Sequence, residues 1–298
     1  MTTPKVDVTR ILHRLLRILH RASAFCSIRV AQTARIGVKS TTVLEARHLV
    51  KRFFGITVVD DVSFAVKPGE VVGYLGPNGS GKTTTGRMLT GLVEPSSGLV
   101  LFDGRPVSTD PLGFRRRLGY VPEEPMLYPF LSAREQLRLL GRLRELPPAT
   151  MERRMTALIE LFGLEEAAEQ PISAYSKGMK QKVLIIAALL HDPDLLIFDE
   201  PDSGLDVTTL LVLRHLMHTL AARGKAILYS SHVLEVVEKL CTRVIILHRG
   251  RIVAQDTIQQ LRSLMARESL EEVFAQLVLE VDPEQTARNI ADVVTRDA

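Results

Sequence analysis

A glycine-rich run at residues 76–83 has the residue types and the spacing to hold a nucleoside triphosphate. Glycines let consecutive backbone N–H groups converge on phosphate oxygens, and a helix that follows them adds its positive N-terminal end. We expect the Lys82 ammonium to reach the β- and γ-phosphates, and the Thr83 hydroxyl to bind Mg²⁺. The run satisfies the Walker A pattern, and the ATP-binding residues that we assign to it are Gly76, Pro77, Asn78, Gly79, Ser80, Gly81, Lys82, Thr83 and Thr84.

Two acidic residues directly follow an apolar run at residues 195–198. A buried strand carries carboxylates at its carboxyl end where a cation or a reacting water needs them. We assign Asp199 to Mg²⁺ and Glu200 to polarising the attacking water, which is the Walker B arrangement. In isolation, a helix cap explains two acids after a strand equally well. The glycine-rich run upstream favours the catalytic interpretation.

Short strands must position both groups. Residues 71–75 are apolar apart from a glycine, and they predict a buried strand directly before the glycine-rich run. Residues 43–53 and 57–66 have β patterns, and the Lys-Pro-Gly-Glu turn at 67–70 suits a hairpin-like edge. Farther on, the pattern alternates between helix (176–190, 208–223) and strand (195–199, 226–230). Such alternation implies a parallel sheet sandwiched by helices.

The segment between about residues 131 and 175 has a different, helical pattern. Ser132 and Glu135 have the spacing of a capping box, and leucines follow them at helical spacing. Pro147 and Pro148 then precede a second predicted helix at residues 151–162. We interpret the segment as a helical insertion.

The composition indicates a globular protein that does not cross a membrane alone. The chain has 298 residues, of which 46% are hydrophobic and 24% charged. Its longest apolar stretch covers residues 183–190, whereas a membrane-spanning helix needs about 20 such residues. The two cysteines, Cys26 and Cys241, fit neither a disulfide framework nor a zinc site and suit a reducing compartment.

The net positive charge of the chain comes from its N-terminal extension. Residues 1–42 carry eight Lys or Arg and one Asp, whereas the remainder carries 30 basic and 33 acidic residues. A mildly acidic body gives nucleic-acid binding no support from composition, so we expect no nucleic-acid partner. Residues 8–22 of the extension predict a basic amphipathic helix. It could lie on a membrane, act as a targeting peptide or stem from a misplaced start, and we favour a loosely ordered tail that the chemistry does not need.

The sequence between residues 43 and 278 resembles the ATP-binding cassette (ABC) ATPases. The diagnostic element is Tyr-Ser-Lys-Gly-Met-Lys-Gln at residues 175–181, where that family carries its signature motif upstream of the Walker B acids. The usual Leu-Ser-Gly-Gly-Gln is altered here, but Ser176 and Gly178 are retained. Ser176 can cap a helix whose N-terminus faces the γ-phosphate of a nucleotide held by a second copy, so the resemblance implies a dimer.

The resemblance assigns further site residues one by one. Asp206 ends the Ser-Gly-Leu-Asp segment at 203–206, which matches the D-loop, and Asp202 stands where the family often has threonine. We expect that replacement to be tolerated. His232 occupies the position of the switch histidine, which contacts the γ-phosphate. Phe54 lies where the family stacks an aromatic ring on adenine, and Phe53 is the neighbouring alternative.

Glu123 is the main departure from the family pattern. It stands in the segment 118–125 where the family usually has a glutamine that contacts Mg²⁺. A carboxylate can also bind magnesium through oxygen, and it adds negative charge near the γ-phosphate. We therefore expect weaker ATP affinity or a stricter Mg²⁺ requirement than a glutamine would give.

The resemblance implies an α/β P-loop NTPase of the ABC ATPase type. Such a fold has a mixed, largely parallel core sheet, an N-terminal antiparallel β subdomain and an inserted helical subdomain. On this basis residues 43–255 form the ATPase domain, with the helical subdomain at about 131–175. Residues 1–42 are a basic extension, and residues 256–298 are a C-terminal helical tail.

The implied function is that of an ATP-hydrolysing subunit of a membrane transporter. It would use ATP and Mg²⁺, form a homodimer, and drive a separate transmembrane permease as a peripheral protein on the cytoplasmic face of the cell membrane. The signature, the Pro-Glu-Glu at 122–124 and the tail at 269–274 resemble the ABC-2 type efflux subgroup and favour export over import. A regulatory protein without activity would be expected to lose Lys82, Glu200 or His232, and all three are present. A cassette protein acting on ribosomes or DNA would need two linked cassettes or a long insertion.

Overall fold

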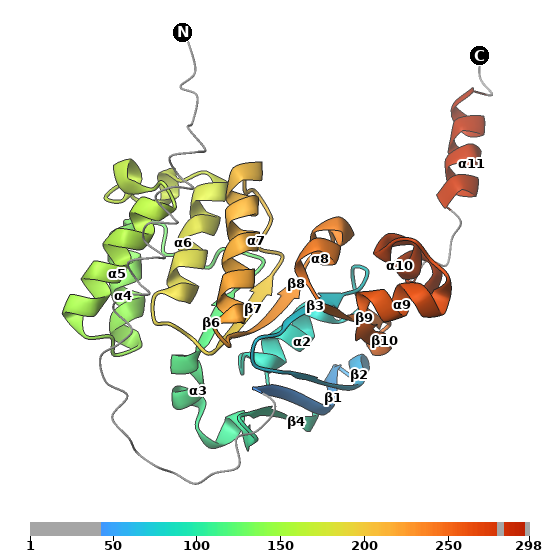
Figure 1. The fold of residues 1–298 in the computed structure, drawn as a ribbon, viewed down its shortest axis with the longest axis horizontal. Coiled ribbons are helices and arrows are strands. Elements are labelled where there is room, and N and C mark those ends of the chain that lie inside the picture. The colour runs from blue at the N-terminus through green and yellow to red at the C-terminus, as the bar shows by residue number, and fades with distance from the viewer. Residues whose placement is uncertain (1–42, 279–282, 296–298) are drawn as a thin grey trace.

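The computed structural model describes residues 43–278 and 283–295, which form two β-sheets with helices around them (Figure 1). The N-terminal extension and its predicted amphipathic helix at residues 8–22 lie outside the described residues. No helix in the described part of the chain is both long and apolar enough to cross a membrane. All the predicted site residues fall between residues 43 and 278.

The first sheet is antiparallel, with the strand order β2-β1-β4-β5. Its strands are β1 (Leu44–Phe53), β2 (Ile56–Val66), β4 (Ser97–Phe102) and β5 (Arg105–Pro106). β1 and β2 form a hairpin that turns at Phe54 and Gly55, both of which have positive φ. The hairpin-like edge predicted at residues 67–70 is wrong, because this turn leaves β2 and enters β3 of the other sheet. The apolar β3 needs cover on both faces, which it finds inside the second sheet, between the antiparallel sheet on one side and helices on the other.

The second sheet has six strands in the order β10-β9-β3-β8-β7-β6. Its strands are β3 (Val71–Leu75), β6 (Leu118–Val121), β7 (Leu195–Asp199), β8 (Ala226–Ser230), β9 (Arg243–His248) and β10 (Arg251–Thr257). Neighbouring strands are parallel except that β10 is antiparallel to β9. Every residue of β3, β7 and β8 is buried, as is typical of parallel strands covered on both faces. These three strands confirm the predicted ones at 71–75, 195–199 and 226–230.

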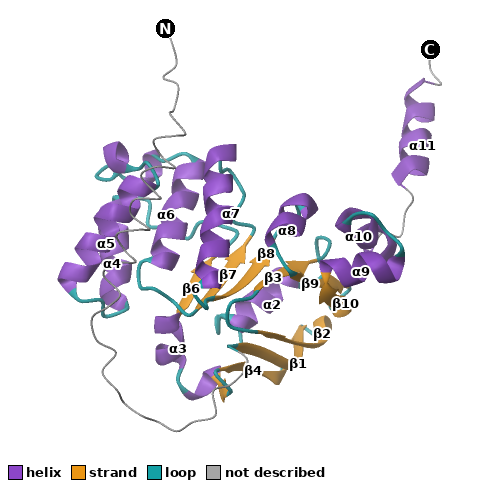
Figure 2. Ribbon diagram, viewed as in Figure 1, coloured by secondary structure: helices purple, strands orange, loops and turns teal. Residues whose placement is uncertain are grey.

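Alternate side chains of the second sheet pack into two separate cores. Val72 and Tyr74 of β3 face the antiparallel sheet, whereas Val71 and Leu75 pack with the helices on the opposite face. Figure 2 shows this layered arrangement of strands and helices. The helices beside the sheets are α2 (Lys82–Leu89), α3 (Pro111–Arg117), α6 (Lys177–Leu189), α7 (Val207–Ala222) and α8 (Leu234–Leu240). The observed layers confirm the predicted architecture, an N-terminal antiparallel sheet beside a mixed, largely parallel core sheet with helices.

Two helices, α4 (Ala133–Leu143) and α5 (Pro148–Leu161), lie in the segment predicted to be helical. The Ser132 hydroxyl accepts from the Glu135 N–H at 3.2 Å, and the Glu135 carboxylate accepts from the Ser132 N–H at 2.8 Å. The predicted capping box is therefore confirmed. α5 begins at Pro148 rather than at the predicted Met151, because proline fits the first turn of a helix. The C-terminal helices are α9 (Ile258–Met265), α10 (Leu270–Val278) and α11 (Pro283–Thr295).

Arg243, at the start of β9, connects the two sheets. Its guanidinium donates to the Ala65 carbonyl of β2 and to both carboxylate oxygens of Glu70, at 2.7 and 3.3 Å. Glu70 lies in the turn between β2 and β3 and also accepts from the Lys67 N–H at 3.0 Å. Both side chains of the ion pair are 17% exposed. Arg243 therefore fixes the turn that aligns β3 with the first sheet.

Replacing Arg243 by alanine should lower the free energy of unfolding by about 2 kcal/mol, because the Glu70 carboxylate and the Ala65 carbonyl lose a charged donor in a partly buried place. Urea denaturation measures the effect. The control is Arg251→Ala, whose ion pair with Asp60 lies at the surface with the arginine 70% exposed and should be worth about 0–1 kcal/mol. Equal losses in the two variants would contradict the role of Arg243.

Candidate active site

The glycine-rich loop joins the buried strand β3 to α2, and two of its glycines have no room for a side chain. A Cβ on Gly76 would lie 2.4 Å from Ser80 Oγ and 2.6 Å from the Leu247 carbonyl oxygen. A Cβ on Gly81 would lie 2.8 Å from the Val58 carbonyl oxygen, and Gly81 has a φ of +100°. The loop is therefore held tightly between β9 and β2, with its backbone turned toward the start of α2.

Lys82 is the first residue of α2, and its ammonium lies against the loop. Nζ donates to the carbonyl oxygens of Gly76 at 2.7 Å and Pro77 at 3.2 Å. Burial lowers the pKa of Lys82, and the carboxylates of Glu200, Asp199 and Glu123 oppose this shift. The side chain is thus a cation placed between carbonyl oxygens and three carboxylates.

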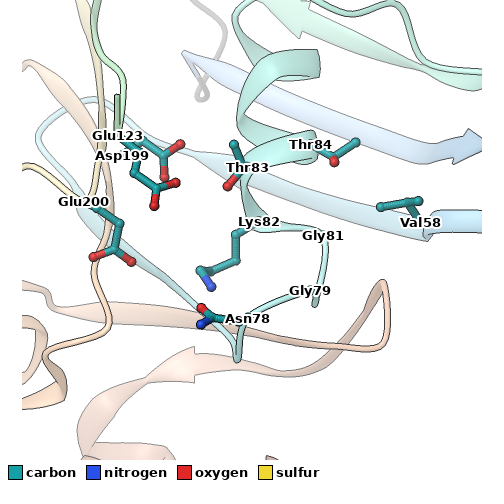
Figure 3. A pocket seen from close by; sticks show the side chains of 10 residues that line it. All are labelled: Val58, Asn78, Gly79, Gly81, Lys82, Thr83, Thr84, Glu123, Asp199 and Glu200. Carbon is teal, nitrogen blue, oxygen red and sulfur yellow. The ribbon is translucent and has the colours of Figure 1, made fainter. Parts of the chain in front are cut away.

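A pocket opens beside this loop and collects residues from five separate parts of the fold (Figure 3). β2, the glycine-rich loop, α2, the segment after β6 and the end of β7 contribute to its lining. Its residues are Val58, Asn78, Gly79, Gly81, Lys82, Thr83, Thr84, Glu123, Asp199 and Glu200. Figure 3 shows the three carboxylates gathered on one side of the pocket, across from the loop. Sequence reasoning missed Val58, because no motif marks a β-strand residue that approaches the loop only in the folded chain.

Asp199, at the end of β7, has one oxygen in use and one without a partner. Its Oδ1 accepts from the Ser230 hydroxyl at 2.6 Å, and its Oδ2 is buried with no hydrogen-bond partner. Burial raises the pKa of Asp199, and the Ser230 hydrogen bond opposes the shift. An unpartnered buried carboxylate oxygen beside a phosphate-binding loop fits a divalent cation. Within the described residues, no three His, Cys, Asp or Glu side chains form a metal site by themselves.

Glu200 and His232 lie next to each other at the carboxyl ends of β7 and β8. The His232 N–H donates to Glu200 Oε2 at 3.1 Å, and the ring Nδ1 of His232 lies 2.6 Å from the same oxygen. The Glu200 side chain is only 12% exposed, whereas that of His232 is 73% exposed. Glu200 has a φ of +49°, a conformation that non-glycine residues adopt at a cost and that is common at functional sites. The pair can place a carboxylate and an imidazole at the mouth of the pocket.

Outside the glycine-rich loop, five predicted site residues do not line this pocket: Phe54, Ser176, Gly178, Asp206 and His232. Phe54 is fully exposed in the turn between β1 and β2. The Ser176 hydroxyl caps α6 by accepting from the Met179 N–H at 3.2 Å. Asp206 caps α7 by accepting from the Thr209 N–H at 2.8 Å. Gly76, Pro77 and Ser80 shape the loop from behind rather than line the pocket.

The signature segment and the D-loop meet through two glycines. A Cβ on Gly178 would lie 2.4 Å from the carbonyl oxygen of Gly204, and one on Gly204 would lie 2.9 Å from the Lys177 side chain. Their backbones are therefore in direct contact. Ser176 and Asp206 cap neighbouring helices on either side of this contact, so the N-termini of α6 and α7 belong to one surface.

Comparison with known proteins agrees with this geometry. A sequence model described as "ABC transporter" matches residues 59–203. The chain is 39% identical over 220 residues to the ABC transporter ATP-binding protein NatA of Bacillus subtilis (strain 168), covering 74% of this chain and 89% of that protein. It is 39% identical over 228 residues to the Nod factor export ATP-binding protein I of Ralstonia nicotianae (strain ATCC BAA-1114 / GMI1000), covering 76% and 71%.

A solved structure of the ATP-binding subunit of an ABC transporter superposes with a TM-score of 0.76. It shares 38% sequence identity with this chain, and the match covers 79% of this chain and 99% of that one. The fold, the position of the pocket and the similarity over most of the length of these relatives lead to one conclusion. The chain belongs to the ABC transporter family and is an ATP-binding subunit, an ATPase whose ATP hydrolysis drives transport.

Proposed function

We propose that this chain is the ATPase of an exporter, in which two copies close over two ATP molecules and drive a separate transmembrane permease. The observation that carries the proposal is the pocket that brings Lys82 together with Asp199 and Glu200 at the ends of adjacent elements. The words "Nod factor export" in the name of one relative support export. The protein then works at the cytoplasmic face of the cell membrane, attached through its permease.

ATP binds with its phosphates on the glycine-rich loop. The backbone N–H groups of residues 78–81 and the N-terminus of α2 surround the β-phosphate, and the Lys82 ammonium moves from its carbonyl partners to the β- and γ-phosphate oxygens. Thr84, in the first turn of α2, also lines the phosphate-binding part of the pocket. The exposed Phe54 ring stacks on adenine, for which an accessible aromatic face is required.

Mg²⁺ fits the donor set on the carboxylate side of the pocket. Thr83, Asp199 and Glu123 would hold it, with the unpartnered Oδ2 of Asp199 as a ready oxygen ligand. Magnesium binds to one or two carboxylates together with substrate phosphates, so a complete protein cage is not needed. When bound, the ion neutralises charge on the β- and γ-phosphates.

Hydrolysis uses Glu200 as the group that orients and polarises the attacking water. Its partner His232 holds the carboxylate through Oε2 and leaves Oε1 for the water. The imidazole also reaches the γ-phosphate. Lys82 and the backbone N–H groups of the loop stabilise the charge that develops on the transferred phosphoryl group.

The second copy completes each site. Ser176 and Asp206 lie on the surface where the signature and the D-loop meet, outside the pocket of their own chain. The hydroxyl of Ser176 and the first N–H groups of α6, including that of Gly178, face the γ-phosphate bound by the partner. The arrangement makes ATP the bridge between two copies, so ATP binding closes the dimer.

An exposed apolar surface near Glu123 supports coupling to the permease. Met126, Tyr128 and Phe130 follow Glu123 in the chain and are 84%, 61% and 89% exposed. Large apolar side chains gathered on one loop mark a protein interaction site. A membrane protein docked on this loop would therefore lie a few residues along the chain from Glu123 and the nucleotide pocket.

Glu200→Gln tests the proposed function. The amide keeps the shape of the side chain but cannot accept a proton, so the ATPase turnover number should fall about 10²- to 10⁴-fold while ATP binding is retained. Steady-state phosphate release and size-exclusion chromatography with ATP and Mg²⁺ measure the two effects, with the wild-type chain as control. We expect the variant to accumulate as an ATP-bound dimer. Turnover at the wild-type rate would refute the role of Glu200, and a variant that stays monomeric with ATP bound would refute the shared site.

Glu123→Gln should relax the dependence on magnesium, because it removes one of the three carboxylates that face Lys82. We expect tighter ATP binding at low Mg²⁺, by roughly threefold to tenfold, as the loss of about one kcal/mol of like-charge repulsion implies. Fluorescent-nucleotide titrations at a series of Mg²⁺ concentrations measure the effect. The neighbouring Glu124→Gln, which removes a carboxylate outside the pocket lining, is the matched control. An unchanged Mg²⁺ profile in Glu123→Gln would exclude Glu123 from the metal site.

A further inference from the structure

Asp202 has both of its carboxylate oxygens bound by residues at the end of β8. Oδ1 accepts from the Tyr229 hydroxyl, and Oδ2 accepts from the Ser231 hydroxyl at 2.8 Å. Tyr229 is completely buried, and Ser231 is 1% exposed. Burial and the Asp202 carboxylate raise the pKa of Tyr229, so its hydroxyl remains a donor. Asp202 thus connects the turn after β7 to the end of β8 through two hydroxyl donors.

Ser231 extends this connection to His232. The Ser231 hydroxyl, which donates to Asp202, also accepts from the Val233 N–H at 3.1 Å. The residue before His232 is therefore hydrogen-bonded, through its hydroxyl, to the backbone of the residue after it. The orientation of that hydroxyl is set by Asp202, because its single hydrogen is donated there.

Glu200 holds His232 at the other end of the same network. Glu200 Oε2 accepts a hydrogen bond from the His232 N–H at 3.1 Å and lies 2.6 Å from the ring Nδ1 of His232. Glu200 and Asp202 belong to one turn, in which the Ser203 N–H donates to the Glu200 carbonyl at 3.4 Å. Two carboxylates from one turn therefore fix the three-residue segment 231–233. Glu200 binds the histidine itself, and Asp202 binds the Ser231 hydroxyl, which in turn accepts from the Val233 N–H.

We propose that Asp202 is a positioning residue for hydrolysis, which fixes His232 against Glu200 through Ser231. The inference rests on the proposed roles of Glu200 and His232. A carboxylate suits this position because it accepts from two hydroxyl donors at once, one on each oxygen. The threonine that the family often has here offers one hydroxyl oxygen, so this chain anchors the histidine segment in its own way.

The proposal separates the effect of Asp202 on turnover from any effect on ATP binding. Asp202 does not line the pocket that contains Lys82 and Thr83. Loss of its hydrogen bonds would leave the phosphate-binding loop in place and free the segment that carries His232. A displacement of about 1 Å in a catalytic group can cost about 10²-fold in rate. Asp202 should therefore govern the turnover number and leave the KM for ATP unchanged.

The first experiment compares Asp202→Ala and Asp202→Asn in the full chain. We expect the ATPase turnover number of Asp202→Ala to fall roughly 10- to 100-fold, with the KM for ATP within about twofold of the wild-type value. Asp202→Asn keeps the shape and one acceptor oxygen, so its turnover number should lie between the two. Asp110→Asn is the matched control, because asparagine can replace Asp110 as the exposed N-cap of α3. A wild-type turnover number in Asp202→Ala would overturn the proposal.

A double-mutant cycle distinguishes positioning from a general loss of structure. If Asp202 acts through His232, Asp202→Ala should lower turnover by less than about twofold in a His232→Ala background. A merely structural role would give the same factor in both backgrounds, and that result would overturn the proposal. Thermal denaturation followed by circular dichroism shows whether each variant folds.

Ser231→Ala provides the same test should Asp202→Ala fail to fold, because it removes the link between Asp202 and Val233 while retaining the carboxylate. The expected loss in turnover and its disappearance in the His232→Ala background are the same, and additivity contradicts the proposal. The outcome also separates this inference from the proposed function. Normal turnover in Glu200→Gln and His232→Ala would refute the proposed function, whereas losses in these two variants with normal turnover in Asp202→Ala would refute the inference alone.

Discussion

The charge balance around Lys82 is the constraint on which the site depends. A half-buried ammonium group lies beside three carboxylates from the ends of two neighbouring strands, and burial lowers its pKa while they oppose the shift. A polyanionic ligand can enter such a pocket only if the ammonium and the backbone N–H groups outweigh the carboxylates. The tight packing at Gly76 and Gly81 keeps the backbone of the loop in place for this task. The excess of carboxylates explains why a divalent cation belongs to the proposed mechanism.

The two-sheet frame serves to bring these charges together. Parallel pairing of β6, β7 and β8 brings Glu123, Glu200 and His232 to one edge, because the carboxyl ends of parallel strands meet there. The antiparallel sheet supports the loop from the other side, where Val58 of β2 meets Gly81. Arg243 binds the two sheets at the turn before β3. ATP hydrolysis at this edge of the second sheet therefore depends on contacts that lie well away from the nucleotide pocket.

Local sequence predicted the parts of this arrangement that local physics decides. The apolar runs of β3 and β7 and the capping box of Ser132 depend on neighbouring residues, and the structure confirms them. The prediction of a hairpin-like edge at residues 67–70 is wrong, because the same residues can close a hairpin or join two sheets. Which of the two forms depends on the distant strand that pairs with β3. Asp202 gave no local signal of its role, since its partners Tyr229 and Ser231 lie 27 and 29 residues away. Val58 likewise reaches the pocket only through long-range packing.

The whole site depends on the binding of a nucleoside triphosphate by the loop around Lys82. Isothermal titration calorimetry of ATP and Mg²⁺ into the full chain, compared with Lys82→Ala, measures this binding. We predict saturable binding by the wild-type chain and an affinity at least tenfold weaker in the variant, because a charge-assisted hydrogen bond to phosphate is worth about 1.5–3 kcal/mol. Equal affinities, or no binding of ATP by the wild-type chain, would show that this loop does not hold the nucleotide.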